Sequence, residues 1–422
     1  MVDSRSMDHI AFEPAVPWVM PFVALLTCIA VLPLAVPHFW ESNARKLAVS
    51  AVLGVPVAAL YWQHSFPTLN HALHDYVSFI ILLGSLFVIS SGVRVDGDLK
   101  ATPATNTTIL GIGSLAASFV GTTGASMLLI RPLLDTNSER QHVVHTVVFF
   151  IFLVSNIGGC LTPLGDPPLF LGYLQGVPFT WTLRLAPAWF TTTLLLLALY
   201  YVWDRRAYAK ESLPALRQDR LTRRPLTVDG KTNLVLLAGI VGAAAFVDAP
   251  WRELLMLALA GVSLWWTPKS IHKANYFSFG PILEVAAVFI GIFTTMMPAL
   301  DLLRAHGASL GVREPWQFFW ATGALSSVLD NAPTYLAFLA LAQGQNLGND
   351  VVGVTHVTLT AISLGAVFMG ANTYIGNGPN FMVRSIAESR GVRMPSFAGY
   401  TVFSAAVLLP VFALITLLFF YP

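Results

Sequence analysis

The strongest structural signal in this chain is the run Asn156-Ile-Gly-Gly-Cys-Leu-Thr-Pro-Leu-Gly-Asp-Pro-Pro168. It interrupts a long apolar segment, residues 143–175, with three glycines, three prolines and one aspartate. Glycine and proline both disfavour the interior of a helix, so a helix that enters this run should break there. Inside a membrane, irregular backbone is tolerated only where protein buries it or water reaches it. The run therefore predicts a broken helix at membrane depth, beside a polar cavity.

The composition is that of a membrane protein. The chain has 422 residues, of which 55% are hydrophobic and only 11% are charged. Soluble domains carry about 25% charged residues, so this chain lacks the polar side chains that a water-facing surface needs. A water-soluble enzyme, a nucleic-acid-binding protein and a disordered scaffold are excluded. The two cysteines, Cys28 and Cys160, lie far apart and provide neither a disulfide framework nor a metal-binding pattern, and no cofactor is expected.

Apolar segments fill most of the sequence. A helix needs about 20 apolar residues to cross the hydrocarbon core of a bilayer. Residues Met1–Glu13 lack the basic start of a secretory signal, so we keep the first apolar run as a membrane span. Three segments are long but interrupted by Gly, Pro, Asn, Asp and Thr clusters, namely 104–131, 143–175 and 313–388. The uninterrupted segments are 15–36, 45–62, 76–93, 184–203, 232–247, 251–267, 281–303 and 397–420.

Two halves of the chain follow the same order of segments. Between them lies the longest polar stretch, residues 204–231, which has eight Lys and Arg residues against four Asp and Glu and is interpreted as a basic cytoplasmic linker. Each half, 1–203 and 232–422, contains three plain helices, two interrupted segments and a last helix. This order predicts an internal repeat, as do two pairs of similar runs: Ser118–Gly124 with Ser327–Pro333, and Thr162–Pro168 with Thr373–Pro379.

Each half is expected to cross the membrane five times and to carry one re-entrant hairpin. The predicted hairpins are residues 104–131 and 313–342, and the predicted broken helices are residues 143–175 and 354–388. An odd number of crossings inverts the second half relative to the first, a common design in secondary transporters. With both termini outside, 19 of the 24 Lys and Arg residues fall in inside loops, in agreement with the positive-inside rule. The predicted fold is an all-α polytopic membrane protein of two inverted repeats, with broken helices at the midplane.

Asp166 and Asp330 are the strongest candidates for a functional role. A carboxylate at the bilayer centre costs about 2.5–3.5 kcal/mol, so an acid at this depth needs an explanation. The alternative is that each aspartate caps a helix or a turn, as aspartate often does beside Pro and Gly. One acid in each half predicts a pair of related sites that could exchange a proton for a cation. The four runs that couple helix breakers to oxygen-bearing side chains are Gly121–Gly124, Gly165–Pro168, Asp330–Pro333 and Gly376–Pro379.

Amide and hydroxyl side chains near the same breaks are candidate ligands for a small cation. Asn331 and Asn377 join Asp166 and Asp330 as candidate Na⁺ ligands, although each asparagine could instead satisfy the broken backbone. Glu284 could line the pathway, or lie at the membrane interface where the helix dipole favours an acid. The remaining candidates, whose side chains could also bond to helix carbonyls, are Thr122, Thr123, Asn156, Thr162, Thr334 and Thr373.

Four motifs carry a resemblance to a known family: Gly121–Ser126, Asn156–Pro168, Ser326–Pro333 and Gly370–Pro379. They resemble the motifs of the ion transporter superfamily, and within it those of the NhaD-type sodium/proton antiporters. The superfamily also includes arsenite pumps and divalent anion/sodium symporters. The resemblance covers nearly the whole membrane domain, and its most specific part is the Asn156–Pro168 run.

The resemblance implies a homodimer in which each protomer has a scaffold part and a transport part that moves like an elevator. The first hairpin tip, Gly-Thr-Thr-Gly, departs from the family pattern because it lacks the Asp-Asn or Ser-Asn-Thr character of such tips among relatives. The side chains that the resemblance brings together are Thr122, Thr123 and Asp166 at one site, and Asp330, Asn331 and Asn377 at the other.

The leading functional hypothesis is a secondary antiporter of a bacterial inner membrane that exports Na⁺ or Li⁺ in exchange for H⁺. Hard cations prefer the carboxylate, carbonyl and amide oxygens that the broken motifs supply. The alternative is a cation-coupled transporter of a carboxylate or another small anion, although no Lys or Arg lies within those motifs. We expect no enzymatic activity, because the two acids belong to separate sites, and no partner besides the ions, membrane lipid and a second copy of the chain. Because the sequence has no ATP-binding motif, uphill transport would draw on an ion gradient.

Overall fold

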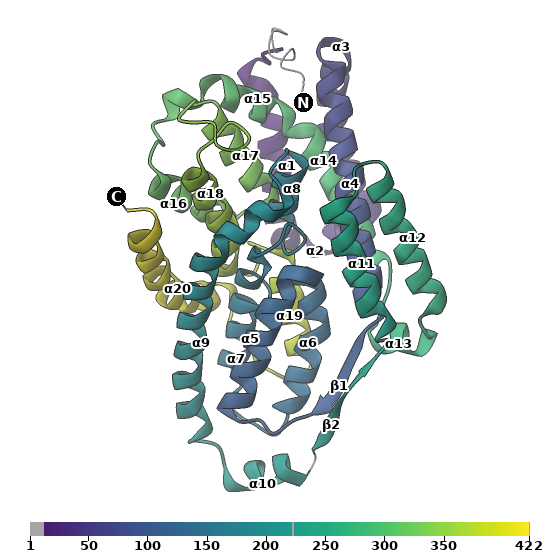
Figure 1. Cartoon of the computed structure of the whole chain (residues 1–422), viewed down its shortest axis with the longest axis vertical. Helices are drawn as coiled ribbons and strands as arrows, with labels where there is room; N and C mark the ends of the chain where they lie inside the picture. Colours follow the sequence, from purple (N-terminus) through teal and green to yellow (C-terminus); the bar gives the residue numbers. More distant parts are fainter. Residues whose placement is uncertain (1–11, 222, 422) are drawn as a thin grey trace.

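The computed structural model describes residues 12–221 and 223–421, and it is mostly helical (Figure 1). The first half contributes three long helices, a helix pair, a broken helix and a last long helix, in that order. The long helices are α1 (Met20–Ala35), α3 (Asn43–His64) and α4 (Phe66–Ser91). The pair is α5 (Pro103–Val120) with α6 (Thr122–Thr136), the broken helix is α7 (Val144–Leu153) with α8 (Pro167–Leu174), and the last is α9 (Ala186–Tyr208).

The second half follows the same order. Its first helices are α11 (Thr232–Phe246), α12 (Trp251–Trp266) and a third span made of α14 (Gly280–Thr295) and α15 (Met297–His306). The pair is α16 (Pro315–Ser326) with α17 (Asn331–Gln343), the broken helix is α18 (His356–Met369) with α19 (Gly378–Ser389), and the last is α20 (Phe397–Phe419). The described residues also include three short α-helices: α2 (Pro37–Trp40), α10 (Leu213–Leu221) and α13 (Lys269–Ala274).

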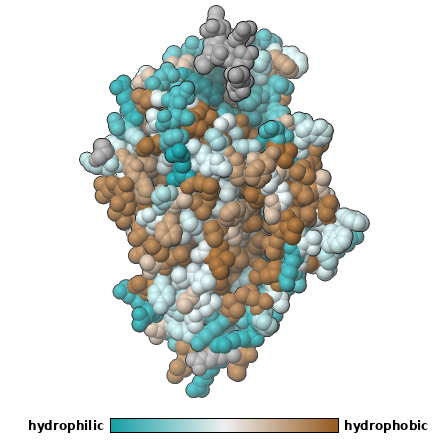
Figure 2. All heavy atoms as spheres, viewed as in Figure 1, coloured by the Kyte–Doolittle hydropathy of each residue, from teal (hydrophilic) through white to brown (hydrophobic). Residues whose placement is uncertain are grey.

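The surface of the molecule is that of an integral membrane protein. On the face drawn in Figure 2, hydrophobic residues gather across the middle and hydrophilic residues toward the two ends. Several large apolar side chains are exposed, among them Val52 and Val402, whose exposed fractions are 72% and 70%. Within the described residues, six helical stretches are long and apolar enough to cross a membrane: Val16–Pro33, Asn43–His64, Phe66–Ser91, Phe179–Tyr208, Gly280–Leu310 and Phe397–Phe419.

Glycines mark three of the four breaks, whereas α16 and α17 are separated by Ser327–Asp330, which contains no glycine. Gly121 separates α5 from α6 with a φ of 81°, a conformation that favours glycine. A Cβ on Gly165 would lie only 2.2 Å from the carbonyl oxygen of Gly159, and a Cβ on Gly376 would lie 2.6 Å from that of Gly370. Because these neighbours are backbone atoms, no side chain fits at either position without moving the chain. The two broken helices therefore depend on the same close contact between two glycines.

One small sheet departs from the all-helical prediction. Strand β1 (Arg94–Asp98) pairs in antiparallel register with strand β2 (Arg224–Asp229), so that Val95 lies opposite Val228. Residues 204–231 therefore form more than a linker, since they also include the end of α9 and the whole of α10. The sheet lies at the same end of the molecule as α10 (Figure 1). Both strands are short and polar, so no alternating hydrophobic pattern predicts them.

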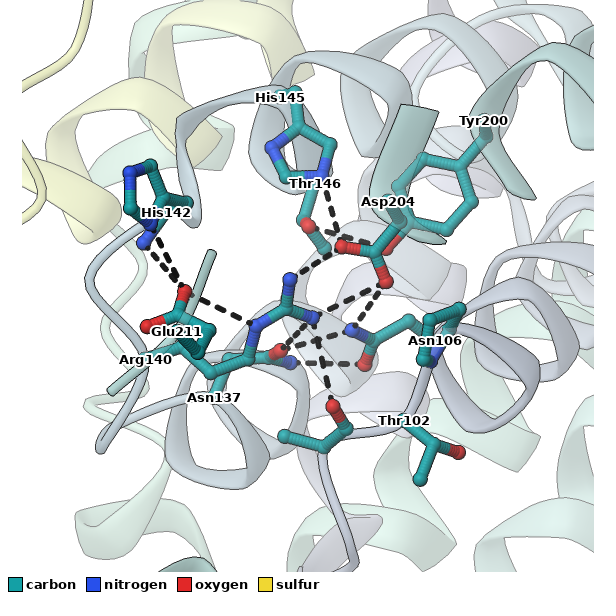
Figure 3. A network of polar contacts seen from close by, with 12 residues as sticks. Thr102, Asn106, Asn137, Arg140, His142, His145, Thr146, Tyr200, Asp204 and Glu211 are labelled. Carbon is teal, nitrogen blue, oxygen red and sulfur yellow. Dashed lines mark hydrogen bonds and ion pairs between the residues drawn. The ribbon is translucent and has the colours of Figure 1, made fainter. Parts of the chain in front are cut away.

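A buried polar network joins the base of the α5–α6 pair to α9 (Figure 3). Arg140 Nη2 lies 2.5 Å from Asp204 Oδ1, and His145 Nε2 lies 2.9 Å from the same oxygen. Asn106 and Asn137 exchange side-chain hydrogen bonds of 2.8 and 2.9 Å. A buried ion pair offsets its desolvation only when further hydrogen bonds satisfy both groups, and Asp204 has such bonds. The network fixes one end of the helix pair against α9.

Candidate functional site

Four helices begin close to one buried carboxylate, that of Asp166. Asp166 itself is the N-cap of α8 and is only 1% exposed. Thr122, the first residue of α6, donates its hydroxyl to Asp166 Oδ1 at 2.8 Å. Asn331, the first residue of α17, donates its amide to Oδ2 at 2.6 Å. Asn377, the N-cap of α19, donates its amide to Oδ1 at 3.1 Å.

This arrangement is electrostatically favourable for a negative charge. The N-terminus of a helix carries a partial positive charge, and here the beginnings of α6, α8, α17 and α19 surround one carboxylate. Thr122, Asn331 and Asn377 are each at most 4% exposed. Three charge-assisted hydrogen bonds thus satisfy Asp166 in a buried setting. Donors from both halves of the chain converge on a single acid, whereas the sequence predicted two separate acid sites.

The two broken helices are built alike. Thr162 donates its hydroxyl to the carbonyl of Ser118 and accepts a hydrogen bond from the backbone N–H of Leu164 at 3.2 Å. Thr373 donates to the carbonyl of Ser327 at 2.5 Å and accepts from the N–H of Ile375 at 3.3 Å. Both threonines were predicted as ligands, but neither has a hydrogen bond to Asp166 in the described structure. Their hydrogen bonds instead hold the turns next to the site. They fasten each break to the helix pair that precedes it in the chain.

A second layer of asparagines supports Asn377. Asn156 accepts a hydrogen bond from Asn377 Nδ2 at 3.2 Å and donates to Asn380 Oδ1 at 2.7 Å. Asn380 in turn donates to the carbonyls of Gly370 and Thr373, at 2.8 and 2.9 Å. Asn156 and Asn380 are both 0% exposed. Asn380 was not among the residues predicted from the sequence, although it directly follows the Gly376–Pro379 run, which is the signal that could have included it.

Asp330 has a different role from Asp166. Its carboxylate accepts the backbone N–H of Ala332 at 3.0 Å and so caps α17, as the alternative interpretation of this residue held. The hydroxyl of Thr334 donates to the backbone carbonyl of Asp330 at 2.9 Å, as threonines in helices commonly do. Asp330 is partly exposed, while Thr334 is buried. Both residues therefore stabilise the first turn of α17, the helix that begins with Asn331.

Two further candidates lie apart from the Asp166 cluster. Thr123 is exposed, unlike its neighbour Thr122. Glu284 forms a 2.6 Å ion pair with Lys46, and half of its side chain is exposed. The interfacial interpretation of Glu284 therefore agrees with its position on α14. Within the described residues, no three His, Cys, Asp or Glu side chains are grouped as for a metal ion. A cation at Asp166 would consequently need amide, hydroxyl or backbone oxygens as its other ligands.

Comparison with known proteins identifies a transporter family. The family model described as “Putative citrate transport” matches residues 12–420. An uncharacterized transporter of Mycobacterium bovis and one of Mycobacterium tuberculosis are each 27% identical over 384 residues, which is 83% of this chain and 87% of theirs. A 46 kDa membrane protein of Mycobacterium leprae is 26% identical over 302 residues, 67% of this chain and 68% of its own. The prediction of a membrane transporter is confirmed, whereas the NhaD-type resemblance stays a prediction.

Proposed function

We propose a transport function from one premise, that this chain belongs to the family described as “Putative citrate transport”. In this proposal the protein is a secondary transporter that carries a small carboxylate, such as citrate, together with a coupling cation. This was the alternative hypothesis of the sequence analysis, and the family now favours it over sodium/proton exchange. The observation that carries the proposal is the buried Asp166 carboxylate, which takes hydrogen bonds from residues of both halves.

The surroundings of Asp166 suit an anionic substrate once the charge of Asp166 is neutralised. The starts of α6, α8, α17 and α19 direct partial positive charge toward one region, and helix N-termini bind carboxylates and phosphates readily. A substrate carboxylate next to an ionised Asp166 would be repelled. Binding of a proton or a Na⁺ ion to Asp166 removes this repulsion. Substrate and cation therefore favour each other's binding, which is the thermodynamic requirement for coupled transport.

The side-chain amides of Asn331 and Asn377 can act either as hydrogen-bond donors to Asp166 or as oxygen ligands of a cation. In the structure Asn331 and Asn377 donate hydrogen bonds from their NH₂ groups to the Asp166 carboxylate. Rotation of each amide by half a turn presents an oxygen instead. With Thr122 Oγ1 and the Asp166 carboxylate, the two amide oxygens would then form an all-oxygen set, which suits Na⁺. We take Na⁺ or H⁺ as the coupling ion, a cargo rather than a resident cofactor.

The matching breaks support the predicted repeats. Thr162 and Thr373 make the same pair of hydrogen bonds, and each follows a glycine that closely contacts another glycine of its own break. On this basis we propose two inverted repeats, 1–203 and 232–422, with re-entrant hairpins at α5–α6 and α16–α17. An elevator-like transport part, a homodimer, an inner-membrane location and termini on the outer side complete the proposal.

Labelled citrate uptake into proteoliposomes tests the function. We expect uptake to depend on an inward gradient of Na⁺ or of H⁺, and Asp166→Asn to abolish it because the variant cannot change its charge. Glu284→Gln is the matched control, since it removes an acid that lies outside the cluster and should leave uptake intact. Full citrate uptake by the Asp166→Asn protein would remove Asp166 from the mechanism.

Sodium/proton exchange is the second candidate, because the same four side chains could hold Na⁺ without any anion. Addition of Na⁺ to proteoliposomes with an imposed pH gradient should then dissipate the gradient in the absence of citrate. If it does so and no labelled carboxylate accumulates, the antiporter replaces the citrate transporter as the function of this chain.

A further inference from the structure

A groove along α9 combines an apolar wall with a basic end. The groove encloses about 650 Å³, and its lining includes Leu195, Leu199, Val202, Trp203, Arg206 and Lys210. Helix α9 runs down the lower left of the molecule in Figure 1, with α10 below its end. Neither the groove nor its basic residues belong to the Asp166 cluster.

The residues of the groove change from apolar to basic along the axis of α9. The intervals from Leu195 to Leu199, Val202 and Arg206 are four, three and four residues, which places these four on one face of the helix. At about 1.5 Å per residue, this face extends about 16 Å, and Lys210 follows in the turn just beyond the end of α9. Its apolar part lies toward the middle of the hydrophobic belt, and its cationic part lies at the end nearest α10. The face thus has the same order of tail and headgroup as a phospholipid leaflet.

The aromatic ring of Trp203 marks the depth at which this change occurs. Trp203 is 42% exposed and packs against Phe403, with ring centroids 5.1 Å apart. It also stacks on His145 at 6.4 Å. Tryptophan is enriched at the level of lipid headgroups, where an amphipathic ring contacts both the apolar core and the polar boundary. The basic residues Arg206 and Lys210 therefore lie at headgroup level, just beyond this ring.

The positive charge at the end of the groove is unbalanced. Arg206 and Lys210 are exposed, and in the described part of the chain neither has an acidic partner within salt-bridge distance. The adjacent acids are engaged elsewhere (Figure 3), since Asp204 pairs with Arg140, and Glu211 lies 3.2 Å from His142 Nδ1.

Glu211 is held as an ionised carboxylate by the loop before α7. Burial alone would raise the pKa of Glu211, but hydrogen bonds from the backbone N–H groups of Gln141 and His142 outweigh this effect, and the pKa lies below its ordinary value. These two bonds, at 3.0 and 2.9 Å, hold the carboxylate against the loop before α7. Glu211 is therefore committed to that loop, and the charges of Arg206 and Lys210 remain available to a ligand.

We propose that this groove binds an anionic phospholipid. Its phosphate group contacts Arg206 and Lys210, and one of its acyl chains lies along Leu195, Leu199 and Val202. Basic pockets between membrane helices on the cytoplasmic side are known to suit acidic headgroups, and the distribution of Lys and Arg in this chain predicts that the α10 end is cytoplasmic. A free phosphate ion would use only the basic end, and a second protein copy would have to bring acids to match it.

Native mass spectrometry of the full-length protein in detergent tests this proposal. We titrate it with dioleoyl-phosphatidylglycerol and, in parallel, with dioleoyl-phosphatidylcholine. Wild-type protein should retain the anionic lipid preferentially. At about one kcal/mol for each basic residue near the headgroups, the double variant Arg206→Gln/Lys210→Gln should bind phosphatidylglycerol about 30-fold more weakly, and Lys210→Gln alone about fivefold. Phosphatidylcholine binding should change little.

The control variant is Arg205→Gln/Arg217→Gln, which removes two exposed charges near the same end but outside the groove. It should retain phosphatidylglycerol like the wild type. The proposal is overturned if both double variants lose the lipid equally, or if the groove variant keeps it. It is also overturned if soluble glycerophosphate competes as well as the intact lipid, or if the groove variant changes only the oligomeric state. Unaltered elution and thermal unfolding confirm that each variant is folded.

Discussion

At the scale of single residues, one carboxylate differs from all the other acids described in the membrane region. Asp166 accepts hydrogen bonds from three side chains that follow three different helix breaks. Asp330, which the sequence ranked beside it, accepts a backbone N–H and caps α17. The distinction could not come from the sequence, because each aspartate lies in a run that combines a helix breaker with oxygen-bearing side chains, Gly165–Pro168 or Asp330–Pro333. It depends on which amides the fold brings to each acid.

Asn377 provides the residue-scale test of this arrangement. Asn377→Ala removes one donor from Asp166 and leaves the oxygen of Asn156 without that partner. Hydrogen bonds to charged groups contribute about 1.5–3 kcal/mol, so citrate transport should fall by about 10- to 100-fold. Asn349→Ala, in an exposed loop, serves as the control and should transport normally. Normal uptake by Asn377→Ala would show that the Asp166–Asn377 contact is not required.

At the scale of elements, the helix breaks were predictable and their partners were not. Gly, Pro and Asp clusters identified the four breaks, since a membrane helix tolerates such clusters only at a polar interior. Most of the plain helices followed from length and hydropathy in the same way, although α11 and α12 are too short for the six stretches that could span a membrane, and residues 281–303 divide into α14 and α15. The pairing of β1 with β2 was missed, because two short polar strands carry no alternating hydrophobic signal. Asn380 was missed because its three hydrogen-bond partners, Asn156 and the carbonyls of Gly370 and Thr373, come together around it only in the folded chain.

Glycine substitutions test the broken helices as elements. Gly165→Ala places a Cβ 2.2 Å from a backbone oxygen of the same break, and Gly376→Ala places one 2.6 Å from its counterpart. Neither neighbour can turn away as a side chain would, so we expect both variants to lose most transport and to unfold at lower temperature. Gly378→Ala, at the start of α19, meets no atom within 4 Å and should behave like the wild type. Uptake rates and thermal unfolding in detergent measure the difference.

If Gly378→Ala lowered transport as much as Gly165→Ala and Gly376→Ala, this explanation would be wrong, because the close contact between two glycines would not account for the loss. The comparison is informative because Gly376 and Gly378 differ by only two positions, yet only one of them closely contacts another glycine. Close contacts between Gly159 and Gly165 and between Gly370 and Gly376 require glycine at the break in both halves. The requirement is the same whether the next residue is an acid, as at Asp166, or an amide, as at Asn377.

At the scale of the whole molecule, polar contacts between helices fall into two kinds: those that would break during transport and those that would persist. The N-terminal end of α8 carries Asp166, whereas Gln175, just beyond its other end, donates a 2.9 Å hydrogen bond to Asp75 on α4. If α8 belongs to a moving transport part and α4 to a fixed scaffold, this bond must break in each transport cycle. Lys46 on α3 and Glu284 on α14 form a 2.6 Å pair that would lie wholly within the scaffold and would persist.

Cross-linking of these two pairs tests elevator-like movement. In a background in which Cys28 and Cys160 are replaced and transport is retained, a short bifunctional thiol reagent should link Asp75→Cys to Gln175→Cys and stop citrate uptake. The same reagent on Lys46→Cys and Glu284→Cys should link α3 to α14 and leave uptake nearly unchanged, because those helices move together. Reductive release of the first link should restore transport, so that the loss reports restrained motion rather than damage. If the α4–α8 link forms fully and uptake continues, α8 does not move relative to α4, and transport must proceed by a local opening around Asp166 instead.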